Sequence, residues 1–266
     1  MQNNKTFVVI AAENLASSLI VRPLFTQHAK NIGAVFLVPN LPVESGKSRL
    51  RALKLIWRAS WFFTFFKLVE IYAHNFLAKR KRLTVKQLSE DSGVKVFEFS
   101  SVKTPEFIET LRSFAPDYIL SAGPAILTKS VLSIPKHGTL NCHGARLPEY
   151  QGAANYIWCL LDRAEYAFTT IQKMELKLDA GPVYAELPIK IDPEWSAYRL
   201  NYEVSKLGGE LYSQTVAKIL EGNELSTITR PDALASNRGI PEPRDIKKFR
   251  NTGHKLLRLK DIFECV

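Results

Sequence analysis

Residues 138–143 read Gly138-Thr139-Leu140-Asn141-Cys142-His143 and are predicted to form a buried strand that ends in polar residues. Because side chains alternate along a strand, Asn141 and His143 are expected on one face and Cys142 on the other. Four earlier apolar runs predict further strands, at residues 6–12, 33–38, 94–99 and 117–121. Helical patterns separate them, with starts predicted at Asn14, near Val85 and at Thr104-Pro105. This alternation predicts an α/β fold with a doubly wound, mostly parallel sheet.

The pattern changes after residue 143. Residues 169–176 and 183–191 alternate as a two-stranded antiparallel hairpin would, with Leu178-Asp179-Ala180-Gly181 between them. A long amphipathic helix is predicted from Ser196 to Glu221. Residues 1–221 are therefore expected to form one domain. Residues 222–266 are expected to be a C-terminal extension, either irregular or a small accessory element.

Three polar residues could meet at the carboxyl ends of the strands, where doubly wound sheets bind ligands. Acyl transfer to an amine needs a hydrogen-bond donor for a developing oxyanion, a group that moves a proton and a carboxylate that orients it. Asn141, His143 and Asp179 could fill these roles. Each residue alone has a simple structural explanation, such as a turn-forming Asp, so their combination and order carry the hypothesis.

Nucleophilic, disulfide and metal chemistry are not expected. The three cysteines, Cys142, Cys159 and Cys265, show no paired spacing, which disfavours a disulfide framework and a structural zinc site. No metal ligands are assigned, and a reducing compartment is favoured. The N-terminal apolar run is short and is interpreted as a strand rather than a secretory signal.

The motifs around these residues resemble the 10-formyltetrahydrofolate-dependent formyltransferase family. The resemblance is strongest over residues 116–192 and rests on the pattern Gly138-x-x-Asn141-x-His143-x-x-x-Leu147-Pro148-x-Tyr150-x-Gly152, followed by Thr170-x-x-x-Met174-x-x-x-Leu178-Asp179-x-Gly181-Pro182. In size and motifs the chain is most similar to the sugar N-formyltransferases. The resemblance implies a Rossmann-like formyltransferase fold, catalytic roles for Asn141, His143 and Asp179, and 10-formyltetrahydrofolate as the formyl donor. It further implies that the pterin is held largely by backbone groups of Pro124, Ala125, Ile126, Leu127, Leu178, Ala180 and Gly181.

The expected product is a formylated primary amine, with an amino sugar on a nucleotide carrier as the favoured acceptor. The loop after the first strand has no glycine and contains Glu13, which disfavours a phosphate cradle. Methionyl-tRNA is the second acceptor considered, and it is disfavoured because the 45 residues after Glu221 are too few for the tRNA-binding barrel of those enzymes. A catalytically idle adaptor is the third alternative. Departures from the usual family residues, at Ala145, Gln151 and Gln172, bear on the acceptor more than on the reaction.

The positive charge of the chain is concentrated in residues 46–83. Ten basic residues and one acid give this segment 10 − 1 = +9 of the total charge of +10. The segment is rich in Trp and Phe and is predicted to be a helical insertion. It could pack on the body or on a second copy in a homodimer, bind an anionic membrane surface through residues 47–82, or bind RNA. The expected location is cytoplasmic, with peripheral attachment to the inner membrane face if the membrane interpretation holds.

Overall fold

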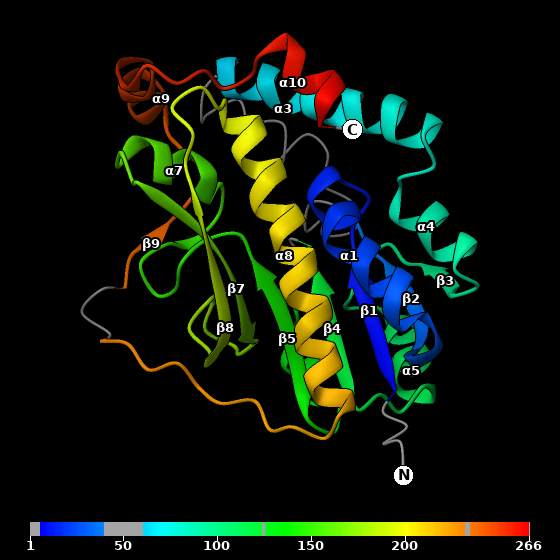
Figure 1. The fold of residues 1–266 in the computed structure, drawn as a ribbon. Helices are drawn as coiled ribbons and strands as arrows, with labels where there is room; N and C mark the ends of the chain where they lie inside the picture. The colour runs from blue at the N-terminus through cyan, green and yellow to red at the C-terminus, as the bar shows by residue number, and fades with distance from the viewer. Residues whose placement is uncertain (1–5, 40–60, 124–125, 232–234, 266) are drawn as a thin grey trace.

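The computed structural model describes residues 6–39, 61–123, 126–231 and 235–265. Its main element is a seven-stranded sheet in the order β3-β2-β1-β4-β5-β7-β8 (Figure 1). The first five strands in this order are parallel, and β7 and β8 join antiparallel as a hairpin. The predicted doubly wound sheet is confirmed. The strands are β1 (Phe7–Ala11), β2 (Ile32–Leu37), β3 (Lys95–Glu98), β4 (Tyr118–Ala122), β5 (Gly138–His143), β7 (Tyr166–Lys173) and β8 (Val183–Lys190).

Helices connect the strands and begin where the sequence places capping residues. Asn14 accepts a hydrogen bond from the Ser17 amide at 2.8 Å, and the Thr104 and Ser196 hydroxyls cap two later helices in the same way. The helices are α1 (Leu15–His28), η1 (Ala29–Asn31), α3 (Trp61–Ala73), η2 (His74–Ala78), α4 (Val85–Asp91), α5 (Pro105–Ser113), α6 (Lys129–Leu132), α7 (Asn155–Leu161), α8 (Ala197–Leu220), α9 (Pro243–Phe249), η4 (Arg250–Thr252) and α10 (Leu259–Glu264).

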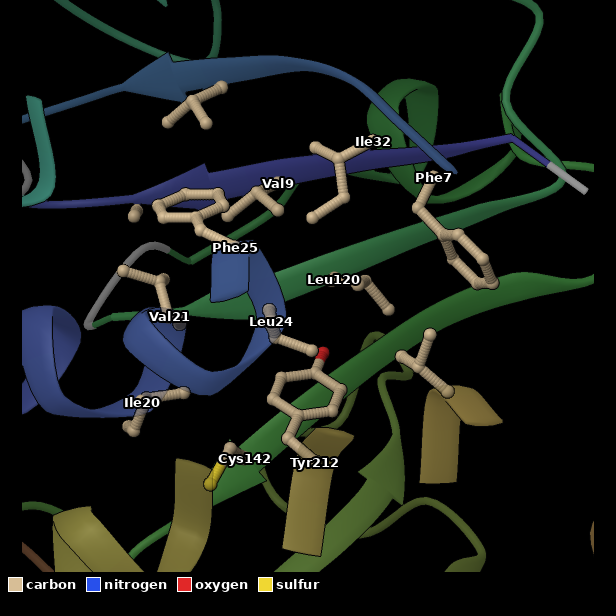
Figure 2. Packing of buried hydrophobic residues seen from close by; sticks show 14 of the residues in the cluster. Phe7, Val9, Ile20, Val21, Leu24, Phe25, Ile32, Leu120, Cys142 and Tyr212 are labelled. Carbon is tan, nitrogen blue, oxygen red and sulfur yellow. The ribbon is translucent and has the colours of Figure 1, made fainter. Parts of the chain in front are cut away.

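Helices cover both faces of the sheet, so its strands are apolar on both sides. In β1, Phe7 and Val9 pack in the cluster under α1 and α8, whereas Val8 and Ile10 pack in the cluster that includes α5. Figure 2 shows Tyr212 of α8 lying against α1 and the sheet in the first cluster. Its hydroxyl donates to the main-chain oxygen of Leu140 in β5 at 2.8 Å, which ties α8 to the strand that carries His143.

A third apolar cluster joins the described part of the basic insertion to the C-terminal extension. It contains Phe63 and Phe66 of α3, residues of α7 and of the start of α8, and Ile246, Phe249 and Cys265 from the extension. The described part of the extension is therefore folded on the body and contains α9, η4, α10 and the short strand β9 (Asn237–Arg238). Residues 40–60, which hold much of the predicted insertion, lie outside the described residues. Within the described ranges, no helix is both long enough and apolar enough to cross a bilayer.

One predicted strand is shifted. The strand expected at 169–176 spans Tyr166–Lys173 instead, because the Lys173 amide donates to the Pro182 oxygen and closes the loop there. Helix α7 starts at Asn155, because Ala154 has a left-handed backbone (φ 56°) that is incompatible with a helical turn.

Candidate active site

His143 ends β5 and is held from one side by its own connecting loop. Its side chain is 7% exposed, and its Nε2 atom lies 2.8 Å from the main-chain oxygen of Tyr150. A carbonyl oxygen can only accept, so Nε2 carries the proton and donates to it. The other ring nitrogen, Nδ1, is left to exchange a proton on the opposite side of the ring.

Asp179 faces that second nitrogen. Its Oδ1 atom lies 3.6 Å from His143 Nδ1, and its side chain is 9% exposed. The carboxylate accepts hydrogen bonds from Gln172 Nε2 at 2.8 Å and from the Gly152 amide at 2.9 Å. These donors fix the carboxylate where it can stabilise a proton on Nδ1.

Asn141 lies two residues before His143 on the same face of β5. It is half-buried and pairs with Gln172 across the β5–β7 ladder, and Gln172 in turn contacts Asp179. The structure thus places His143 beside Asp179, with Asn141 on the adjoining position of the same face. This arrangement combines an amide donor, an imidazole and a carboxylate.

Cys142 belongs to the opposite face, as predicted from strand alternation. It lies in the cluster under α1 and α8, with its Sγ atom 3.6 Å from the Thr169 hydroxyl. Burial raises the pKa of the Cys142 thiol to about 12. A thiolate nucleophile is therefore disfavoured at this position.

The loop of the Asp179 motif depends on two tight backbone positions. Asp179 itself adopts the left-handed conformation (φ 49°). Gly181 is required for a different reason, since a Cβ atom there would lie 1.9 Å from the Lys173 main-chain oxygen. The turn and the close approach together return Asp179 to the sheet.

Several contacts in the site are not predicted by the sequence. The Asn155 side chain, 7% exposed at the start of α7, lies 3.0 Å from His143 Nε2. Gln151 Nε2 donates to the Asp179 main-chain oxygen at 2.9 Å. Gln151 and Gln172 were both visible as departures from the family pattern, and both contact Asp179. No sequence signal pointed to Asn155.

The C-terminal extension supports the site loop. Residues Gln151–Gly152 form β6, which pairs in parallel with β9 of the extension. A Cβ atom at Gly152, where φ is 104°, would lie 2.1 Å from the Arg238 main-chain oxygen. Only glycine fits between Arg238 and the carboxylate of Asp179. The extension, expected to be an accessory element, therefore helps to place the donor that binds Asp179.

The residues expected to hold a pterin occupy two loops. Pro124 and Ala125 lie outside the described residues. In the first loop, Ile126 is 61% exposed and Leu127 is buried. In the second loop, Leu178 is 45% exposed, and Ala180 and Gly181 are half-buried. Exposed apolar side chains beside backbone polar groups suit a flat ring system that carries hydrogen-bonding edges.

The loop after β1 is used to support the fold. The Glu13 carboxylate accepts hydrogen bonds from the amides of Val85 at 3.1 Å and Lys86 at 2.8 Å, at the start of α4. At the end of β4, a Cβ atom on Gly123 would lie 3.2 Å from the Ala12 amide. These contacts occupy the position where a phosphate loop would lie between β1 and β4.

Comparisons with known proteins relate the chain to formyltransferases. The formyl transferase family model matches residues 72–216. Methionyl-tRNA formyltransferase from Geobacter sulfurreducens is 37% identical over 139 residues, which cover 52% of this chain and 44% of the relative. The chain spans about half the length of the relatives of this kind that it matches.

Solved structures share the fold at low identity. The N-formyltransferase from Helicobacter canadensis, in complex with folinic acid and dTDP-3-aminofucose, superposes with a TM-score of 0.54 and 16% identity, covering 90% of this chain and 71% of that one. Phosphoribosylglycinamide formyltransferase from Streptococcus pneumoniae has a TM-score of 0.55 and 15% identity, covering 81% of this chain and 98% of that one. The family model matches more than half of the chain, and the chain belongs to the formyl transferase family.

Proposed function

We propose that this protein transfers a formyl group from 10-formyltetrahydrofolate to a primary amine, with an amino sugar on a nucleotide carrier as the acceptor. The observation that carries the proposal is the pairing of His143 Nδ1 with Asp179 Oδ1 at 3.6 Å, next to Asn141, in a chain of the formyl transferase family. We assign catalytic roles to these three residues.

The donor supplies an activated formyl carbon, and the residues of the chain act on charge and protons around it. The Asn141 amide would donate to the formyl oxygen as negative charge develops there, a contribution worth about a hundred- to a thousandfold in rate. His143 accepts the proton that the amine loses, at Nδ1, and returns it to the departing nitrogen. Asp179 stabilises the ring while that proton is held, and general acid–base catalysis of this kind contributes about 10²- to 10⁴-fold.

The donor would be held by the two loops described above. Ile126 and Leu178 offer exposed apolar surface. The backbone of residues 126–127 and 178–181 offers hydrogen-bonding groups. The main-chain oxygen of Asp179 accepts a hydrogen bond from Gln151 of β6, which holds this loop in place. Because this loop is already ordered, binding of the folate costs little conformational entropy.

Two findings favour an amino-sugar acceptor. The Helicobacter canadensis N-formyltransferase, which shares the fold, was solved in complex with folinic acid and dTDP-3-aminofucose. In this chain Glu13 occupies the loop after β1 and caps α4, which disfavours a ribonucleotide phosphate at that loop. An acceptor that needs no phosphate site at this loop, such as a sugar nucleotide, fits this arrangement better.

Methionyl-tRNA is the second candidate acceptor. Sequence relatives at 31–37% identity over 139–162 residues are methionyl-tRNA formyltransferases. The matches cover only 44–49% of these relatives, so they support the chemistry more than the acceptor.

A direct assay separates the two acceptors. Purified protein is incubated with 10-formyltetrahydrofolate and either a panel of nucleotide-linked amino sugars or charged initiator tRNA, and mass spectrometry detects the formyl adduct. We expect formylation of at least one amino-sugar nucleotide. Formylation of charged tRNA alone would transfer the assignment to the second candidate.

Substitutions test the assigned residues in the same assay. Asn141→Ala and Asp179→Ala should each lower turnover by about a hundredfold or more, with unchanged circular dichroism, because each removes one stabilising group. If both variants retain wild-type turnover, the assigned mechanism is wrong. If calorimetry detects no folate binding by the wild-type protein, the catalytically idle adaptor is favoured instead.

A further inference from the structure

An exposed apolar stripe runs along α3 and the π-helical turn η2. Phe65, Leu68, Tyr72 and Phe76 follow one another at helical spacing and are 61%, 51%, 70% and 55% exposed, with Ile71 beside them at 48%. The Tyr72 and Phe76 rings stack with centroids 6.1 Å apart. We call these five residues the apolar stripe. Contiguous exposure of large apolar side chains marks an interaction surface.

The opposite side of α3 is already occupied. Phe63 and Phe66 are each 3% exposed within the third apolar cluster. Lys67 forms an ion pair with Glu70 and lies 3.4 Å from the Tyr156 hydroxyl of α7. The helix is thus fixed to the body by one face, and the apolar stripe is the face that remains for another partner.

Positive charge flanks the apolar stripe. Lys79 and Arg80 follow it directly and are exposed. By sequence, residues 46–83, which include the stripe, carry +9 of the total charge of +10. Two copies meeting through this surface would bring like charges together, which disfavours a homodimer contact here. Anionic lipid headgroups complement both the charge and the apolar side chains.

We propose that the apolar stripe docks into the surface of an anionic membrane, with Lys79 and Arg80 at the headgroups. Leu68 and Ile71 favour lipid over single-stranded RNA, since aliphatic side chains offer no ring on which a base can stack. A helix fixed along one side to the protein body lies in the plane of the interface rather than across it. The proposal is independent of the acceptor and of formyl transfer.

Docking would place the site close to the membrane surface. Tyr156, which contacts Lys67 of α3, follows Asn155, which contacts His143. One short helix, α7, therefore joins the packed side of α3 to the proposed catalytic residue.

Vesicle flotation tests the proposal without any turnover measurement. Full-length protein is mixed at low salt with vesicles of phosphatidylcholine alone or with phosphatidylglycerol added. We expect binding to the vesicles that contain phosphatidylglycerol, weakened by added salt, and little binding to phosphatidylcholine alone. Failure to bind either vesicle would overturn the proposal and leave the proposed enzymatic function untouched.

Two matched double variants locate the surface. Leu68→Ser/Tyr72→Ser should reduce binding by about tenfold or more, because burying a large apolar side chain contributes on the order of a tenfold change in partitioning. Tyr166→Ser/Leu176→Ser removes the same residue types from sites that are 43% and 68% exposed elsewhere, and should bind as the wild type does. Thermal melts confirm that both are folded.

The remaining outcomes identify other occupants. Equal binding by the two double variants would contradict docking through the apolar stripe. A dimer in analytical ultracentrifugation that Leu68→Ser/Tyr72→Ser abolishes, without vesicle binding by the wild type, would assign the surface to a second copy. Binding of poly-uridine through the stripe in place of vesicles would assign it to RNA.

Discussion

The orientation of Asp179 is set by three donors from neighbouring segments. Gln172 binds Oδ1, the Gly152 amide binds the other carboxylate oxygen, and Gln151 binds the main-chain oxygen. Gln172 is 1% exposed and does not titrate. The neutral amide of Gln172 on β7 therefore positions the carboxylate of Asp179 against His143.

Replacing Gln172 should affect the chemical step more than binding. In Gln172→Leu, Asp179 loses a hydrogen bond to a charged group, worth about 1.5–3 kcal/mol, so kcat should fall by roughly tenfold to a hundredfold with little change in KM. Gln172→His, which restores a ring N–H donor, should recover most of the loss. Steady-state kinetics with the acceptor found above measures both, and an unchanged kcat in Gln172→Leu would contradict the positioning role.

At the scale of elements, two adjacent glycines allow α8 to pack on two sides. A Cβ atom on Gly208 would lie 2.7 Å from Cys142 Sγ of β5, and one on Gly209 would lie 2.5 Å from the Leu19 main-chain oxygen of α1. Glycine inside a helix usually costs about 1 kcal/mol relative to alanine. Here that cost is offset by a close approach between α8, α1 and the sheet.

Gly209→Ala should therefore destabilise the protein despite its better helix propensity. The added methyl group meets the backbone of α1, and overpacking of this kind lowers the free energy of unfolding by about 1–3 kcal/mol. Urea denaturation measures the change. Gly239→Ala is the matched control, since a Cβ atom there meets nothing within 4 Å, and its midpoint should stay unchanged or rise slightly. Equal midpoints for the two variants would refute the packing argument.

At the scale of the whole molecule, α1 and α8 enclose a histidine that links stability to pH. His28 Nε2 lies 3.0 Å from the Ser213 main-chain oxygen and 2.9 Å from its hydroxyl. Burial lowers the pKa of His28 below its ordinary value of 6.5, and the hydrogen bond to Ser213 only partly opposes this. The unfolded chain therefore takes up a proton at a higher pH than the folded protein.

The free energy of unfolding should consequently fall as the pH drops below 6.5, because the unfolded state then binds more protons at His28. Urea titrations at about pH 7.5 and about pH 5.5 measure the loss. In His28→Gln the loss should be smaller, because the group that titrates is removed. The same loss in both proteins would show that other groups account for the acid sensitivity.

Most of the sheet was predictable because its signals are local. Apolar runs between capping residues such as Asn14 and Thr104 place strands and helix starts within a few residues. The hairpin was predicted, but its first strand begins and ends earlier than expected. The end of β7 is set by the hydrogen bond from the Lys173 amide to the Pro182 main-chain oxygen, and residue type alone does not reveal that bond. From the sequence, Glu13 was interpreted only as unfavourable for phosphate binding. Nothing in the neighbouring sequence indicates that its carboxylate contacts the start of α4.

The sequence by itself determined the alternating α/β pattern, the polar residues at the end of β5 and the uneven charge, since each depends on composition or on spacing along a few residues. Only the tertiary structure decided how Asp179 is oriented, that β9 supports Gly152 and that one face of α3 is buried while the other stays exposed. These features arise from contacts between segments that are far apart in the chain. Such contacts depend on how packed layers bring those segments together, and no local preference of the residues specifies them.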